Sequence, residues 1–76
     1  MNNPLLLEAL KARYKADELD AVARISVYVR NAAGIGEHPQ ITEEMNKLVQ
    51  QYVDAKDKHS AVEEIEARFY NQSLKS

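Results

Sequence analysis

Few side chains in this sequence combine the residue types and spacing that a reaction or a bound cofactor needs. Gly34-Ile35-Gly36 is similar to the start of a phosphate-binding loop. Such a loop follows a strand and continues with a third glycine or a Lys-Ser/Thr pair. The strand, the third glycine and the Lys-Ser/Thr pair are all missing here. A helix cap followed by a turn accounts for the two glycines, so no nucleotide or other cofactor is expected.

The two histidines, His38 and His59, are the first candidates for metal ligands. Metal sites between helices combine several histidines and carboxylates, for example as Glu-x-x-His on facing helices. No Glu stands three residues before either histidine, and Lys56 takes that place before His59. We therefore predict no metal site. His59 is expected to set the helix register, and His38 to belong to the start of a helix.

The remaining polar and aromatic clusters have structural explanations. Glu63, Glu64 and Glu66 form an acidic run typical of a solvated helix face. The tyrosines recur at helix-packing positions, where the ring is buried and the hydroxyl reaches the edge. No nucleophile–base pair can be assigned, so no catalytic residue is predicted. The chain has no cysteine, which excludes disulfides and thiolate metal sites.

Length and composition restrict the protein to one small helical domain. It has 76 residues, of which 45% are hydrophobic and 29% charged, and Ala, Glu, Lys, Leu and Arg dominate, which favours helix. The net charge of −2 argues against a sequence-independent nucleic-acid binder. The first residues have no basic region and only a short apolar run, so we expect neither a signal peptide nor a membrane span. We therefore expect a cytoplasmic protein.

Glycine and proline divide the chain into two helical arms. We predict one all-α domain over residues 1–76: a helix over about 4–33, a bend at 34–38, a helix over about 39–71 and a frayed tail at 72–76. Gly34 suits the left-handed C-cap, and Pro39 suits the first turn of the second helix, with Thr42 as a rival start. The bend residues are Gly34, Gly36, Glu37, His38 and Pro39.

Apolar residues in both arms recur at alternating spacings of three and four, as in a coiled coil. The pattern is strongest in the second arm, and Asp17 interrupts it in the first. Residues 25–29 alternate like a strand, but a lone strand would lack a partner, so we keep them helical. The predicted seam between the helices contains Leu7, Leu10, Tyr14, Ile25, Tyr28, Ile41, Met45, Leu48, Tyr52, His59, Val62 and Phe69.

The first arm carries a second apolar stripe, rich in alanine, which suggests a second neighbour at close range. Alanine is also a good surface helix former, so a bare surface is the alternative. Two helices alone make a thin core, which oligomerisation or docking usually completes. We predict a homodimer forming a four-helix bundle, or a hairpin clamped on a larger protein. The candidate face for this partner contains Leu5, Ala9, Ala12, Ala16, Leu19, Ala23 and Val27.

The segment over residues 31–49, N-x-x-G-I-G-E-H-P-Q-I-T-E-E-M-x-K-L-V, resembles small conserved helical proteins of tailed bacteriophages of the myovirus type. The resemblance centres on the bend and the start of the second helix, and the arms match only in general character. It implies a phage accessory or virion-associated protein, in the host cytoplasm or in the virion. No activity and no site residues transfer with it.

Three functions follow as hypotheses. The first is a non-enzymatic structural or interaction protein that self-associates or docks through its helix faces. The second is a small adaptor that binds and modulates a phage or host enzyme. The third, a metal- or nucleotide-dependent enzyme, has the least support. The expected partner is therefore a protein, and no nucleic acid, membrane or small-molecule substrate is predicted.

Overall fold

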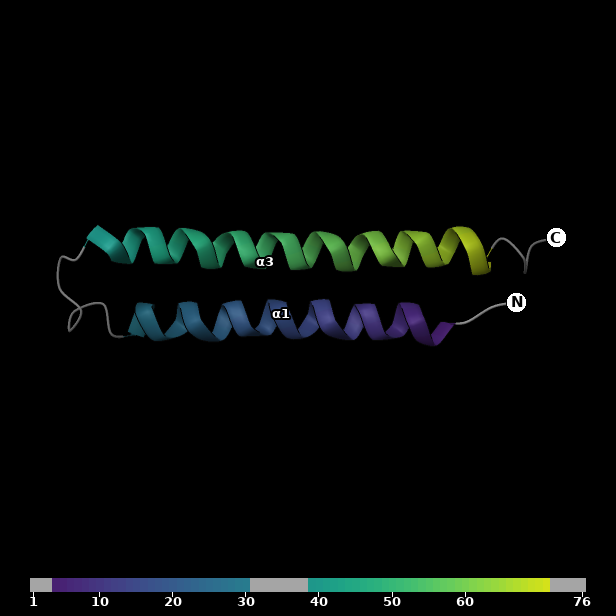
Figure 1. Cartoon of the computed structure of the whole chain (residues 1–76), viewed down its shortest axis with the longest axis horizontal. Coiled ribbons are helices and arrows are strands. Elements are labelled where there is room, and N and C mark those ends of the chain that lie inside the picture. The colour runs from purple at the N-terminus through teal and green to yellow at the C-terminus, as the bar shows by residue number, and fades with distance from the viewer. Residues whose placement is uncertain (1–3, 31–38, 72–76) are drawn as a thin grey trace.

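The computed structural model describes residues 4–30 and 39–71, and every one of these residues is helical. Helix α1 spans Pro4–Arg30, helix α3 spans Pro39–Glu66, and a π-helical turn, η1, covers Ala67–Asn71. The two long helices run antiparallel, side by side, along their whole length (Figure 1). The predicted all-α hairpin is confirmed. The predicted bend at 34–38 and the tail at 72–76 lie outside the described residues.

Each long helix follows from an uninterrupted run of helix-compatible residues. Beyond the prolines that open them, neither α1 nor α3 contains proline or glycine. Pro39 opens α3, where its fixed φ suits the first turn and its missing N–H costs no hydrogen bond. Residues 25–29 are helical despite their β-branched side chains. Their apolar side chains face the packed and the outer surfaces of a helix, and no strand runs beside them among the described residues.

The core is a narrow seam between the two helices. Its fully buried apolar residues in the described part are Ala21, Ala55 and Val62, which are 0%, 3% and 5% exposed. The two alanines lie near the middle of their helices. Side chains this small allow the helix axes to approach closely, since interaxial distance depends on the residues at the contact. A larger side chain at either position would have to displace the facing helix.

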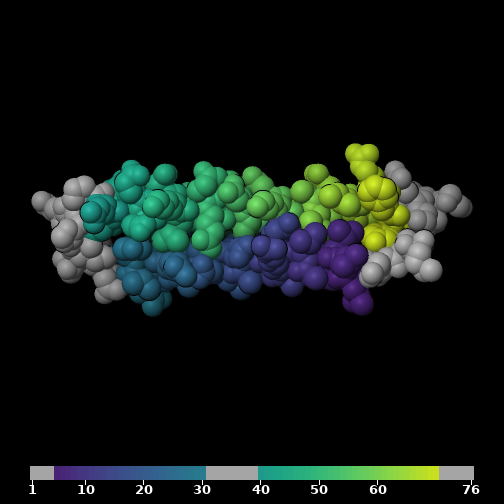
Figure 2. All heavy atoms as spheres, in the orientation of Figure 1, coloured from purple at the N-terminus to yellow at the C-terminus, as the bar shows by residue number. Residues whose placement is uncertain are grey.

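The hairpin is long and thin. It measures 59 × 15 × 14 Å, and its radius of gyration is 17.5 Å, against about 11 Å for a compact globule of the same length. Figure 2 shows the atoms of the two helices in contact along the hairpin, from the start of α3 beside the end of α1 to the end of α3 beside the first residues of α1. A two-rod shape of this kind leaves both helices with an outer side that the chain itself does not cover.

Candidate functional site

The residues predicted for the seam lie between the helices, with one exception. Val62 is buried, and the others up to His59 are half-buried. Phe69 does not lie in the seam, because it is 67% exposed. The π-turn of η1 adds one residue to the last helical turn, so Tyr70 rather than Phe69 follows Glu66 on the inner side and is half-buried. Nothing in the sequence pattern signals this change of phase.

Lys11 and Glu66 form an ion pair that crosses the hairpin near its open end. Lys11 Nζ lies 2.9 Å from Glu66 Oε1, and each side chain is 21% exposed. Hydrogen bonds to Glu66, and secondly to Glu8 at 3.2 Å, raise the pKa of Lys11 above its ordinary value. This pair joins residues at opposite ends of the chain, so it favours one alignment of the two helices over slipped ones.

Glu66 was assigned above to a solvated acidic run, and Lys11 was not predicted to lie in the seam. A spacing of four and three counted from Leu7 leads to Lys11, Tyr14, Glu18 and Ala21 without interruption. Lys11 and Glu18 are half-buried, whereas Asp17, which was taken for the interruption, is exposed. The heptad register, read through polar residues as well as apolar ones, is the signal that would have found both.

Gln51 makes a second set of polar contacts between the helices. Its side-chain amide donates to the backbone carbonyl of Asp17 at 2.8 Å and to the carboxylate of Asp20 at 3.0 Å. Asp20 also accepts from Arg24 Nε at 3.1 Å. These hydrogen bonds, that from Gln51 first, lower the pKa of Asp20. Sequence reasoning did not single out Gln51, since a glutamine beside a seam has no pattern of its own.

Two tyrosines of the seam, Tyr14 and Tyr52, lie under lysines at its edges. Lys58 Nζ lies 5.8 Å from the ring centre of Tyr14 on the other helix, and Lys56 Nζ lies 5.8 Å from the ring centre of Tyr52. These are cation–π distances. His59 places Nδ1 3.7 Å from Glu63 Oε1, one turn along α3. Each of these groups therefore has a structural contact within the hairpin.

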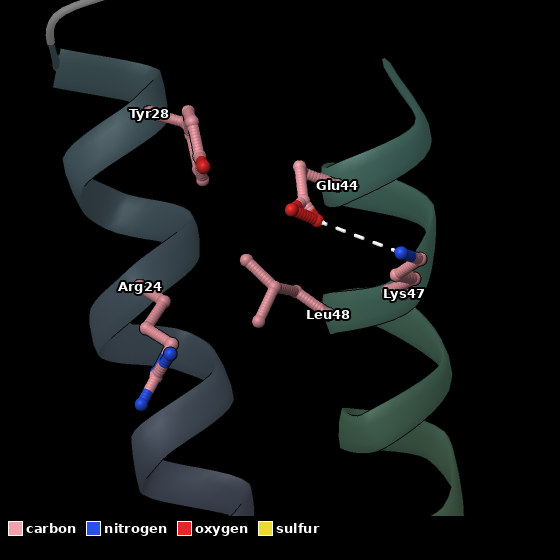
Figure 3. Close-up of a pocket in the computed structure, with 5 residues that line it drawn as sticks. All are labelled: Arg24, Tyr28, Glu44, Lys47 and Leu48. Carbon is pink, nitrogen blue, oxygen red and sulfur yellow. Dashed lines mark ion pairs between the residues drawn. The ribbon is translucent and has the colours of Figure 1, made fainter. Parts of the chain in front are cut away.

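A shallow groove of about 240 Å³ opens on one side of the hairpin. Arg24 and Tyr28 of α1 line it together with Glu44, Lys47 and Leu48 of α3, and Leu48 points between the helices (Figure 3). Its charges pair along their own helices: Glu44 with Lys47 at 3.9 Å, and Arg24 with Asp20 at 3.1 Å. The groove is open, and its polar groups do not converge on one point, so its walls suit solvent better than an enclosed substrate.

The predicted partner face lies on the outside of α1. Leu5, Leu19 and Val27 are 75%, 58% and 56% exposed, and the four alanines of that face are exposed too. Large apolar side chains are also exposed elsewhere on both helices. They are Leu6, Val22 and Val29 of α1 and Val49, Val53 and Ile65 of α3, with Phe69 of η1.

The predicted bend residues Gly34, Gly36, Glu37 and His38 lie outside the described residues, and Pro39 begins α3. Within residues 4–30 and 39–71, no group of three or more His, Asp or Glu side chains is arranged to hold a metal ion. None of the described helices combines the length and apolar character needed to cross a membrane.

Comparison with known proteins adds no relative. No protein-family profile, curated protein or solved structure matches this chain.

Proposed function

We propose that this chain is a non-enzymatic interaction protein that works by packing its helix faces against another protein surface. The observation that carries the proposal is the imbalance between its interior and its exterior. The fully buried apolar residues in the described part are two alanines and a valine, while leucines, valines and a phenylalanine are more than half exposed.

This imbalance has an energetic meaning. Burial of apolar area is the main favourable term in folding, and an alanine contributes little of it. Ordering two long helices costs backbone entropy at every residue. A hairpin of this size gains stability when its outer apolar side chains are buried by a partner, since binding to the folded state alone stabilises that state.

The setting we propose is a phage virion or a phage-infected cell, as a virion component or an accessory factor. The resemblance at residues 31–49 supports this setting, because it covers the bend and the start of α3. Mass spectrometry of purified particles separates the two cases, since a virion component would be present in stoichiometric amounts.

Light scattering after size-exclusion chromatography, combined with circular dichroism, tests the proposal. We expect either an oligomer, or a monomer whose helicity and melting temperature are low until a partner protein is added. The melting temperature of an oligomer should rise with protein concentration. The proposed function is refuted by a monomer that is fully helical and melts cooperatively, with the same melting temperature over roughly a 100-fold range of protein concentration.

A further inference from the structure

The two long sides of the hairpin differ in chemistry. The Gln51 contacts and the groove beside Tyr28 and Glu44 lie on one side, which we call the charged side. In an antiparallel pair of heptad-patterned helices, the positions flanking the seam meet their equivalents on the same side. The opposite side, here called the neutral side, is therefore made of Leu5, Glu8, Ala12, Lys15, Leu19, Val22, Ser26, Val29, Thr42, Asn46, Val49, Val53, Lys56, Ser60, Glu63 and Ala67.

Nearly all of the neutral side is solvent-exposed, with only Ser26 half-buried. Its charged residues are Glu8, Lys15, Lys56 and Glu63, and the rest are apolar or small and uncharged. The charged side, in contrast, carries charges along its whole length, among them Arg13, Asp17, Asp20, Arg24, Glu44, Lys47, Asp54, Lys58 and Arg68. Depletion of charge on a surface with exposed leucine and valine is the composition of an interface core.

The four charges of the neutral side are ordered in two layers. Lys11 meets Glu66 and Asp20 meets Gln51 across the hairpin. This alignment places Lys15 of α1 at about the level of Lys56 of α3. Glu8 and Glu63 both lie two helical turns closer to the open end. A basic layer is thus followed by an acidic layer.

The intramolecular partners of these charges leave them accessible. Glu8 pairs with Lys11 at 3.2 Å and Lys15 with Glu18 at 3.7 Å, each along α1, yet both Glu8 and Lys15 stay 58% exposed. Glu63 is also 58% exposed beside His59.

The neutral side is complementary to itself under a two-fold rotation. In α1, Ala12 is flanked at equal distances by Leu5 and Leu19, and at nearly equal distances by Glu8 and Lys15. In α3, Ser60 is flanked in the same way by Val53 and Ala67, and by Lys56 and Glu63. Ala12 and Ser60 lie at about the same level of the hairpin. A single two-fold axis at that level, perpendicular to the helices, therefore relates both α1 and α3 to their copies in a second chain.

We propose that a second copy of this chain docks on the neutral side around this two-fold axis. Helix α1 then lies antiparallel on the partner's α1, and α3 on the partner's α3, so the open halves of two hairpins form a four-helix bundle. Leucine meets leucine at Leu5 and Leu19, and the basic layer of each copy lies on the acidic layer of the other. The same patch serves both copies, as a two-fold interface requires. This inference rests on the proposed function and names its partner and surface.

The docked arrangement differs from the face predicted from sequence. It keeps Leu5, Ala12 and Leu19 of that face, and adds the flank of α3. The outermost residues, Ala9, Ala16 and Ala23, fall at the edge of the contact or outside it. Using both helices covers more apolar area than a contact through α1 alone, which favours a stable dimer.

Charge-exchange variants test the proposal. The double variant Lys15→Glu/Lys56→Glu has an all-acidic neutral side, and Glu8→Lys/Glu63→Lys has an all-basic one. Each alone should dimerise about 100-fold more weakly than the wild type, because four attractive pairs per dimer become repulsive. An equimolar mixture should form a heterodimer, since every contact between the layers then joins opposite charges. Native mass spectrometry, with one of the two variants uniformly labelled with ¹⁵N, distinguishes the heterodimer from both homodimers by mass.

A matched pair of apolar variants tests the position of the axis. Leu19→Ser removes a side chain that the proposed contact buries, whereas Val29→Ser alters one on the same helix and side that lies beyond the overlap. Leu19→Ser should weaken the dimer at least about tenfold more than Val29→Ser does. Circular dichroism before mixing checks that each variant is helical.

The outcomes separate the two proposals. A wild-type dimer that neither charge variant weakens, or helical variants that fail to pair when mixed, would overturn the neutral-side interface and leave the interaction function standing. A wild-type hairpin that binds a different protein instead of a second copy would also overturn the neutral-side interface and leave the interaction function standing. A wild-type chain that is a stable folded monomer at every concentration would overturn both.

Discussion

Burial of Ala55 between the two helices leads to the sharpest prediction for stability. Ala55 is 3% exposed in the seam, while Ala61, on the same helix, is exposed on the outer surface. The same substitution, to leucine, can be made at both positions. Helix propensity changes by the same small amount in each case, so any difference between the variants reports on packing.

Leucine at position 55 adds three carbon atoms where the facing helix leaves no room. Overpacking a close-packed site costs about 1–3 kcal/mol, because side chains leave their rotamers or the backbone moves. For a domain of this length, 1 kcal/mol corresponds to roughly 4–8 °C in melting temperature. Ala55→Leu should therefore lower the melting temperature by about 5–20 °C. Ala61→Leu should change the free energy of unfolding by less than about 0.5 kcal/mol, as at other surface sites.

Thermal and urea unfolding followed by circular dichroism at 222 nm measure both variants. All proteins must be compared at one concentration, because self-association makes the melting temperature concentration-dependent. If the free energies of unfolding of Ala55→Leu and Ala61→Leu differ by less than about 0.5 kcal/mol, the two helices are not closely packed at this level. Ala55 would then not be enclosed by the facing helix.

Three further outcomes are expected. Val62→Ala should cost about 1–3 kcal/mol, since it removes two buried methyl groups and leaves a gap; denaturant unfolding would contradict this by showing no shift in midpoint. Glu66→Leu should lower the melting temperature by removing the acceptor of Lys11 on the other helix, and Lys11→Leu/Glu66→Leu should recover it; equal melting temperatures for the single and double variants would refute the pairing. Because Gln51 lowers the pKa of Asp20 below 3.8, the stabilisation from Asp20 is present above that pH and is lost as pH falls through the folded-state value. Carbon-detected NMR of the carboxyl should show this low midpoint, and Gln51→Leu should raise it.

Regular features of the sequence were enough to predict the hairpin. Pro4, Pro39 and the glycines at 34 and 36 bracket two long runs without a helix breaker, and the 3–4 spacing of apolar residues identifies the inner side of each run. Each of these signals lies within a short stretch of the sequence, so it can be recognised without knowing how the two helices pair.

The parts that escaped prediction depend on how the two helices align. Lys11 and Glu18 lie in the seam because of their register, although their side chains are charged. Gln51 has partners only because the antiparallel pairing brings it beside Asp17 and Asp20. Phe69 left the seam because one extra residue entered the last turn. The positions of Lys11 and Glu18 follow from the periodicity of α1 once polar residues are included, whereas the contacts of Gln51 and the shift at Phe69 do not follow from the periodicity of a single helix.

The arrangement of the seam also determines the order in which the hairpin can form. Tyr28 and Ile41, which line one surface depression near the bend, are close in the chain, whereas Lys11 and Glu66 are 55 residues apart. Loop-closure entropy rises with the length of chain to be closed. We therefore expect pairing to start beside the bend and to advance toward the termini, because each turn formed shortens the loop that the next must close. The open ends, which the proposed second copy would cover, would then be the last part of a single chain to assemble and the first to fray.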